Sequence, residues 1–160
     1  MYKRQKSITV QSYYTPIISE IAVWRVNSKG KSDENGEYTI LKWVDSVRAL
    51  SNNTRTVLVQ YQKKDSSTWE TYSSTISTTT SGEKRTCQTA MIPTSSDYSF
   101  NFKISVKDAI TNTYVTRETM VSTGYTIFDV DPTGKMIAFG KVAEKIGMDI
   151  DMPLSLIHIS

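Results

Sequence analysis

The segment from Tyr98 to Val106 most constrains the fold of this chain, because apolar and polar residues alternate strictly along it. Every second position is apolar, and the five apolar residues are Tyr98, Phe100, Phe102, Ile104 and Val106. A period of two places these side chains on one face of a β-strand and leaves the other face in water. The segment therefore predicts a strand that covers a hydrophobic core.

Six further segments are short, rich in β-forming residues and bounded by turn residues: Ile17–Val26, Glu37–Val47, Thr56–Lys64, Trp69–Ser73, Lys84–Met91 and Thr113–Val121. About a quarter of the chain is Ser or Thr, which favours strands with hydroxylated outer faces over helices. This pattern predicts an all-β chain whose residues 16–123 form an immunoglobulin-like or fibronectin type III-like β-sandwich. A small β-barrel is the alternative, since runs of period two suit both.

The connections between these strands carry turn signals. Asn35-Gly36 predicts a turn between the first two strands, and Asp65–Thr68 predicts a hairpin turn before Trp69. The polar stretch Ser74–Glu83 is interpreted as a connection. Trp24 and Trp43 lie in the first two strands, where either side chain is large enough to fill the space between two sheets.

Charge and cysteine content exclude several classes of protein. The net charge of +3 comes from scattered residues, with one basic run at Met1–Lys6, so no nucleic-acid-binding face is predicted. No apolar stretch reaches the 18 or more residues of a membrane span, and the first residues lack the apolar core of a signal peptide. We expect Cys87 to be a small buried core residue of a protein made in a reducing cytoplasm. The single histidine, His158, supports no catalytic triad and no metal site.

The segment Phe128–Pro153 differs from the rest of the chain and contains three of its seven glycines. Asp129 to Thr133 has the Asp-x-Asp-x-Thr form of haloacid-dehalogenase phosphatases, but too few residues follow to supply that fold. Gly134-Lys135 to Gly140-Lys141 approaches a phosphate loop, although the spacing is too long and Val142 stands where the hydroxyl is needed.

A calcium loop is a third interpretation of the same segment, because Asp129, Asp131 and Gly134 match its first ligands, but no Glu completes the pattern. Turn chemistry between short strands explains these residues better. Ile137–Gly140 and Met148–Met152 predict short strands that need covering by the edge of the sandwich or by sister chains. We therefore expect residues 124–153 to form a β-hairpin-rich assembly segment.

Residues at the two ends of the chain have a different character. Ile8–Ser12 resembles Ile104–Asp108, which predicts that residues 1–15 hold the closing strand of a preceding module and a hinge, with a chance match as the alternative. Residues 154–160, LSLIHIS, resemble a translation of the mosaic-end adaptor used in transposase-based sequencing libraries. We expect these last residues to be a non-native tail.

Nearly the whole chain is similar to one family. Val23–Gly30 with Asp33, Gly36 and Tyr38, the hairpin YQKKDSSTW, the strand YSFNFKISVKD and above all FDVDPTGKMIAFGKVAEKIGMDIDMPL resemble minor structural tail proteins of siphophages and prophages of Gram-positive bacteria. The sequence departs from the family at Met136, where a second glycine is common, and completely after Pro153.

The resemblance implies a virion protein of the distal tail or tail fibre, without catalytic activity or cofactor. Its implied partners are other tail proteins and a host surface glycan, and the short strands that need covering add sister chains in a homotrimer. A cell-surface adhesion or carbohydrate-binding module is the alternative, because sandwiches present aromatic platforms to sugars. The candidate residues for such a platform are Tyr13, Tyr14, Tyr72, Tyr114 and Tyr125, although linker and core packing is the preferred interpretation of each.

Overall fold

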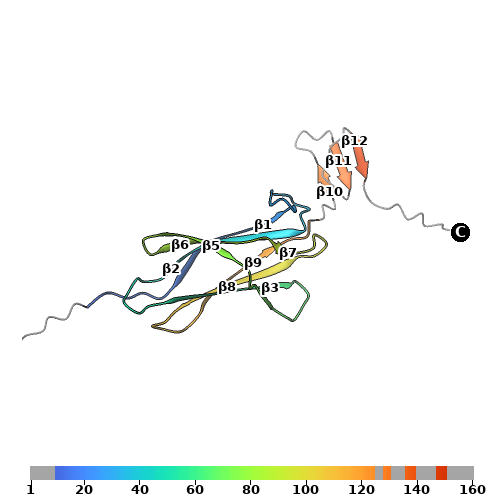
Figure 1. Cartoon of the computed structure of the whole chain (residues 1–160). Coiled ribbons are helices and arrows are strands. Elements are labelled where there is room, and N and C mark those ends of the chain that lie inside the picture. The colour runs from blue at the N-terminus through green and yellow to red at the C-terminus, as the bar shows by residue number, and fades with distance from the viewer. Residues whose placement is uncertain (1–9, 125–127, 131–135, 140–146, 151–160) are drawn as a thin grey trace, which may run out of the picture.

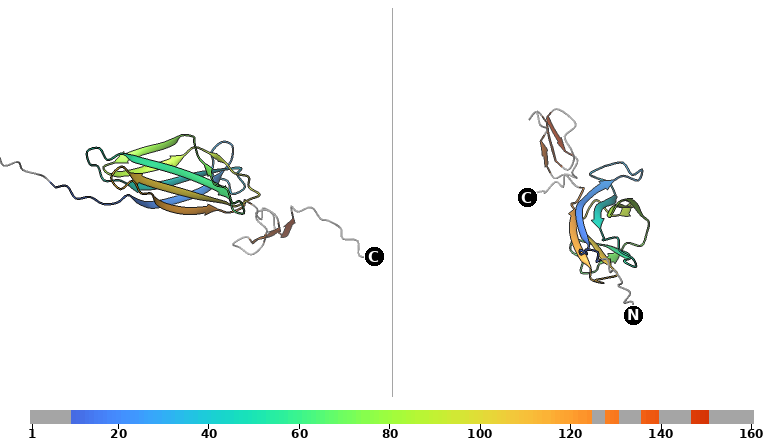
Figure 2. Two further views of the ribbon diagram at one scale, coloured as in Figure 1. Left: turned by 90° about the horizontal axis from the view of Figure 1, so that it is seen from below. Right: turned by 90° about the vertical axis from the view of Figure 1, so that its left-hand side faces the viewer.

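Every regular element that the structure describes is a β-strand (Figure 1). This computed structural model describes residues 10–124, 128–130, 136–139 and 147–150. Residues 16–123 contain two antiparallel sheets, one of five strands and one of four, which lie face to face (Figure 2). The described part of the chain is thus all-β, and this part has the architecture of a β-sandwich, as the alternation predicted.

Groups of two or three consecutive strands belong alternately to the first and the second sheet. The first sheet has the order β1-β2-β6-β5, with β7 beside β2, and consists of β1 (Ile17–Val26), β2 (Tyr38–Ser46), β5 (Ile76–Ser81), β6 (Lys84–Thr89) and β7 (Ile92–Pro93). The second sheet has the order β4-β3-β8-β9 and consists of β3 (Arg55–Lys63), β4 (Glu70–Thr71), β8 (Phe100–Asp108) and β9 (Val115–Val121).

All seven predicted strands occur, and β5 and β7 occur in addition. The interpretation of Ser74–Glu83 as a connection was wrong, because it contains β5, which pairs with β6 from Ile76 to Ser81 without a break. Five of these six residues are Ser or Thr, so no apolar alternation marks the strand. Thr is β-branched and suits an extended, exposed strand.

The core lies between the two sheets and is formed by side chains of both. Its largest fully buried members include Trp43 and Leu41 from the first sheet and Phe102, Ile104 and Val59 from the second. The prediction for Trp43 is confirmed, whereas Trp24 is only half-buried. Cys87 is fully buried in this core, as expected.

The alternation in β8 is confirmed at three of its five positions. Phe102, Ile104 and Val106 are fully buried, and Phe100 is half-buried. Tyr98 was placed wrongly on the buried face, because the chain turns at Ser95 to Tyr98 and the strand begins after it. Its side chain is 44% exposed, with the ammonium group of Lys63 3.0 Å from the ring centroid.

The predicted turn at Asn35-Gly36 occurs in the loop between β1 and β2, where the backbone N–H of Gly36 donates to Asp33 O at 3.0 Å. The positive φ of this loop is at Gly30, where the backbone N–H donates to Asn27 O at 2.9 Å. Gly36 is required for another reason: a Cβ at this position would lie 2.2 Å from the carbonyl oxygen of Val26. The glycine therefore permits a close backbone approach rather than a left-handed turn.

The C-terminal segment contains a third, smaller sheet of three short strands. β10 (Phe128–Val130) pairs antiparallel with β11 (Met136–Phe139), and β11 pairs parallel with β12 (Gly147–Ile150). The expectation of a hairpin-rich extension is right for the first pair and wrong for the second. In the described residues β11 pairs with both β10 and β12 and none of the three pairs with the sandwich edge, whereas covering by sister chains stays a prediction. Alternation marks a strand but gives no direction for its pairing.

The chain enters and leaves the sandwich at opposite ends (Figure 1). At the end called the entry end here, Tyr13 contacts Asp108, the last residue of β8. At the exit end, Ser122 and Tyr98 meet around Arg25, just before β8 begins. Because β8 has nine residues, about 26 Å separate these two places.

Candidate functional site

The entry end is closed by two tyrosines that precede β1. The Tyr13 hydroxyl donates to Asp108 Oδ2 at 2.8 Å, and the Tyr14 hydroxyl donates to Glu83 Oε2 at 2.7 Å. Arg48 adds a third attachment by donating from Nε to the carbonyl oxygen of Ser12 at 3.0 Å. Three consecutive residues of the entering chain are therefore bonded to the end of β8, to the β5–β6 turn and to the β2–β3 connection.

Asp108 is the centre of the first attachment and is 1% exposed. Besides Tyr13, its carboxylate accepts from the backbone N–H and hydroxyl of Thr111 and from the Asn53 side chain, at 2.9 to 3.1 Å. Burial opposes ionisation, but the hydrogen bonds from Thr111, Tyr13 and Asn53 outweigh it and lower the pKa of Asp108 to about 2. The entering chain is thus bonded to a carboxylate that stays ionised above that pH.

The lowered pKa predicts a loss of stability in acid. The stabilisation by Asp108 is present above the ordinary pKa of Asp, about 3.9, and is lost as the pH falls toward its folded pKa of about 2. We expect the difference in free energy of unfolding between wild type and Asp108→Asn to shrink between pH 5 and pH 2. Urea unfolding followed by tryptophan fluorescence measures it, with the exposed Asp65→Asn as control. A difference that stays constant over this range would contradict the assignment.

The second attachment of the entering chain uses the turn between β5 and β6. Glu83 accepts from the backbone N–H of Ala49 at 3.0 Å, from Tyr14 and from Arg48 Nη1 at 3.0 Å. The N–H of Ala49, the Tyr14 hydroxyl and the Arg48 guanidinium together hold the pKa of Glu83 below its ordinary value. Arg48 also lies 6.0 Å from the centroid of the Tyr14 ring. These contacts link the entering chain to the far edge of the first sheet.

The exit end is organised by the buried side chain of Arg25, which is 5% exposed. Its guanidinium donates to four carbonyl oxygens: Ser122 at 2.9 Å, Gly36 and Thr94 at 3.1 Å each, and Tyr98 at 2.7 Å. Burial lowers the pKa of Arg25, and the charge of Glu37 partly opposes this. One side chain therefore joins β1, two connections and the segment that leaves the sandwich.

The leaving chain is held a second time at Gly124. Its backbone N–H donates to Ser96 O at 2.8 Å, and the hydroxyl of Ser96 donates to Glu37 Oε1 at 2.6 Å. A Cβ on Gly124 would lie 2.5 Å from the carbonyl oxygen of Glu34. The last described residue before the C-terminal segment is thus packed directly against the β1–β2 loop.

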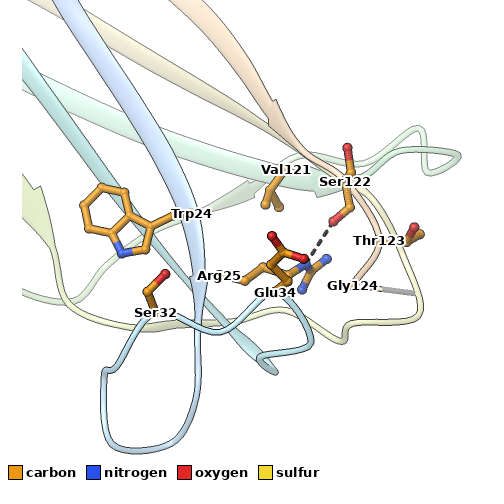
Figure 3. A pocket seen from close by; sticks show the side chains of 8 residues that line it. All are labelled: Trp24, Arg25, Ser32, Glu34, Val121, Ser122, Thr123 and Gly124. Atoms are coloured by element: carbon orange, nitrogen blue, oxygen red, sulfur yellow. Dashed lines mark hydrogen bonds between the residues drawn. The ribbon is translucent and has the colours of Figure 1, made fainter. Parts of the chain in front are cut away.

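A pocket of about 380 Å³ lies at this exit end (Figure 3). It lies between the β1–β2 loop and the leaving chain. Its lining includes an aromatic ring, Trp24, one cationic side chain, Arg25, and one anionic side chain, Glu34. The lining residues are Trp24, Arg25, Ser32, Glu34, Val121, Ser122, Thr123 and Gly124. In Figure 3 the Arg25 guanidinium points toward Ser122, to which it is bonded.

Several polar positions of the β1–β2 motif that carries the family resemblance have a structural explanation. Asn27 Oδ1 accepts from the backbone N–H of Lys29 and Lys31 at 3.0 and 3.2 Å. Asp33 Oδ1 likewise accepts from Asn35 N at 3.0 Å. Together with Gly30, Gly36 and Arg25, these side chains shape the loop that lines the exit pocket.

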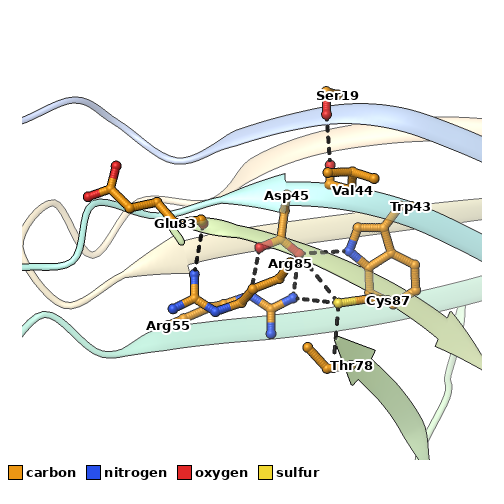
Figure 4. Close-up of polar contacts among 9 residues, drawn as sticks. All are labelled: Ser19, Trp43, Val44, Asp45, Arg55, Thr78, Glu83, Arg85 and Cys87. Carbon is orange, nitrogen blue, oxygen red and sulfur yellow. Dashed lines mark hydrogen bonds and ion pairs between the residues drawn. The ribbon is translucent and has the colours of Figure 1, made fainter. Parts of the chain in front are cut away.

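A buried ion pair joins the two sheets inside the sandwich (Figure 4). Asp45 on β2 has no exposed surface, and its carboxylate is bonded by both Nε and Nη2 of Arg55 on β3, the first at 2.7 Å. Trp43 Nε1 also donates to Asp45, at 2.9 Å, and Cys87 Sγ lies 3.1 Å from Arg55 Nη2. The sequence did not reveal this ion pair, nor the contact between Cys87 and Arg55.

The tyrosines proposed as a sugar platform have separate roles in the described residues. Tyr13 and Tyr14 attach the entering chain, and the Tyr72 hydroxyl donates to Thr75 O and accepts from Ala90 N. Tyr114 is 41% exposed, with Lys107 4.9 Å from its ring centroid. Tyr125 lies outside the described residues. The one stacked ring pair recorded among described residues is Tyr61 with Phe102, in the core.

Most residues behind the three chemical interpretations of the C-terminal segment also lie outside the described residues. Asp129 is in β10, whereas 131–135 and 140–146 are not described. Among the described residues no group of three His, Cys, Asp or Glu is placed to hold a metal ion. The described part of the chain contains no helix of the length and apolarity needed to cross a membrane.

Comparison of the chain with protein-family models, with curated protein sequences and with solved structures found no match. The role of the entry and exit ends is therefore inferred from their geometry and from the sequence.

Proposed function

We propose that this chain is a structural component of a phage tail or tail fibre, in which the sandwich acts as a spacer and residues 124–153 as an assembly segment. The observation that carries the proposal is the placement of entry and exit at opposite ends of the sandwich, each bonded to its body. A domain of this kind adds its own length to a tandem array. It also fixes the orientation of the following segment relative to the preceding one.

Strand order supports an immunoglobulin-like or fibronectin type III-like type for this sandwich. In immunoglobulin-like folds the sheets have the orders A-B-E-D and C-F-G. The first sheet follows the same scheme with β1, β2, β6 and β5, and the second with β3, β8 and β9. β4 and β7 are two-residue additions to it. Modules of this type are often strung in tandem, which fits a spacer.

The buried polar groups also fit a structural role better than a catalytic one. Asp45, Arg55 and Arg25 are bonded to one another or to backbone carbonyls, and each bond joins separate strands or connections. The family resemblance adds the tail location, with other tail proteins, sister chains in a homotrimer and a host surface glycan as proposed partners. The virion, after synthesis in the host cytoplasm, is the proposed location.

Electron microscopy of phage particles labelled with antibodies against this chain tests the proposal. We expect label on the distal tail, and genes for tape-measure and baseplate proteins beside its reading frame. Unlabelled particles, together with specific binding of the chain on a glycan array, would contradict the proposal and favour the adhesion module. A monomeric mass of the native protein would contradict the homotrimer.

A further inference from the structure

The outer edge of β5 lacks the features that protect the other edges of the sandwich. Proteins block sheet edges with bulges, charges, short strands or a covering segment. The edge strands β1 and β9 lie against each other, and the register of β1 shifts between Ile18 and Ile21. β9 carries Arg117 and Glu118, and β4 has two residues. β5 has six uncharged residues, no proline and an unbroken register.

The register of the β5–β6 hairpin shows which backbone groups of β5 point outward. The hairpin closes at Ser81 and Lys84 around a two-residue turn, in which Gly82 has a φ of 61°. A closing pair of this kind is hydrogen-bonded, and such pairs alternate along an antiparallel ladder. Ser77 and Thr79 therefore bond to β6, whereas the N–H and C=O groups of Ile76, Thr78 and Thr80 point away from it. Within the described residues no strand pairs with that side.

The sequence of this edge is complementary to itself. Residues 77–81 read Ser-Thr-Thr-Thr-Ser, which is the same in both directions. In an antiparallel pair centred on Thr79, Thr78 lies opposite Thr80 of a second copy and Ser77 lies opposite Ser81. The outward N–H and C=O groups of Thr78 then meet those of Thr80, and each cross-strand pair within residues 77–81 joins identical residue types.

We propose that β5 pairs with β5 of a second copy of this chain, about a two-fold axis at Thr79, and joins their two first sheets into one. Cross-strand Thr pairs stabilise antiparallel strands, and no charge on β5 opposes the approach. An isologous contact requires this kind of self-complementarity. A single strand pair buries little surface, so the contact is weak and forms where assembly raises the local concentration to about the millimolar range.

The register makes a cross-linking test specific. Thr79 faces its own copy as a non-hydrogen-bonded pair, with Cα atoms about 4.5 Å apart, which suits a disulfide. We expect the full-length Thr79→Cys variant to form a covalent dimer on mild oxidation. Ser77→Cys is the matched control, because two copies of residue 77 lie about 13 Å apart in this register. Equal cross-linking of the two variants, or none in Thr79→Cys, would overturn the pairing. The native Cys87 is buried and common to both.

A charge exchange tests the same axis without a covalent bond. Thr79→Lys places two like charges opposite each other, as does Thr79→Glu, and each variant is expected to weaken self-association roughly fivefold or more. An equimolar mixture of the two is expected to regain it. Thr56→Lys, at an exposed position of β3, is the control. Analytical ultracentrifugation gives the affinities, and circular dichroism checks the fold. Unchanged association in Thr79→Lys, or no gain on mixing, would contradict the proposal, whether or not the chain belongs to a tail.

Discussion

The Arg25→Met variant is expected to lose about 3–5 kcal/mol of unfolding free energy. The guanidinium donates to the carbonyl oxygens of Ser122, Gly36, Thr94 and Tyr98, and methionine can donate to none of them. Buried carbonyl groups left without a donor carry a desolvation cost, and hydrogen bonds from charged donors are the stronger ones. Methionine keeps much of the side-chain volume, so the loss reports the hydrogen bonds rather than a cavity.

Two further variants separate this effect from a general loss of charge. Arg25→Lys retains the charge but offers a compact ammonium group in place of a planar fork, so we expect it to lose about half as much. Arg117→Met removes an exposed arginine of β9 and is expected to change stability by less than about 0.5 kcal/mol. Urea unfolding followed by tryptophan fluorescence measures all three. A loss below about 1 kcal/mol for Arg25→Met would show that Arg25 does not hold the exit end together.

The second large effect is expected from Asp45→Ala, which should also cost about 3–5 kcal/mol. Asp45 accepts from both Arg55 and Trp43 at a position with no exposed surface. Its removal leaves a charged guanidinium that is largely buried, and an indole N–H without an acceptor. Both losses are more costly than the lost attraction alone.

A double variant distinguishes a broken ion pair from a cavity. We expect Asp45→Leu with Arg55→Met to be more stable than Asp45→Ala, because no unpaired charge remains. The same unfolding experiment on Asp45→Leu, on Arg55→Met and on the double variant gives the coupling energy between the two positions. Additive losses would show that Asp45 and Arg55 act independently, which their bidentate contact makes unexpected.

The strands were predictable where one face of a segment is apolar. Phe102, Ile104 and Val106 alternate because one side of β8 covers the core, and this pattern alone located the strand. β5 gave no such signal, because its Ser and Thr side chains are exposed on an edge. Its existence depends on pairing with β6 through the two-residue turn at Gly82, and hydrophobic alternation does not record such pairing.

The polar groups that fasten the sandwich were not predictable from the sequence. Arg25 stands between Trp24 and Val26 in an apolar run. This position among apolar neighbours is the one sequence signal that the arginine is buried. Its four partners are carbonyl oxygens, which carry no side-chain identity. The contacts of Tyr13 with Asp108 likewise join residues 95 positions apart. Linker packing was the preferred interpretation of Tyr13 and Tyr14 over sugar binding, but their partners Asp108 and Glu83 appear only in the fold.

A spacer must hold its entering and leaving segments at a fixed separation, and one distance measures this directly. We propose spin labels at Ser12→Cys and Thr123→Cys in the full chain, both at exposed positions beside the attachments. Pulsed electron paramagnetic resonance is expected to give one narrow distribution of label distances centred at about 30 Å. We expect this distribution to broaden when Tyr13 and Tyr14 are both replaced by phenylalanine. A broad distribution, or a short distance between the labels in the unmodified background, would contradict the proposal that the sandwich is a spacer fixed at both ends.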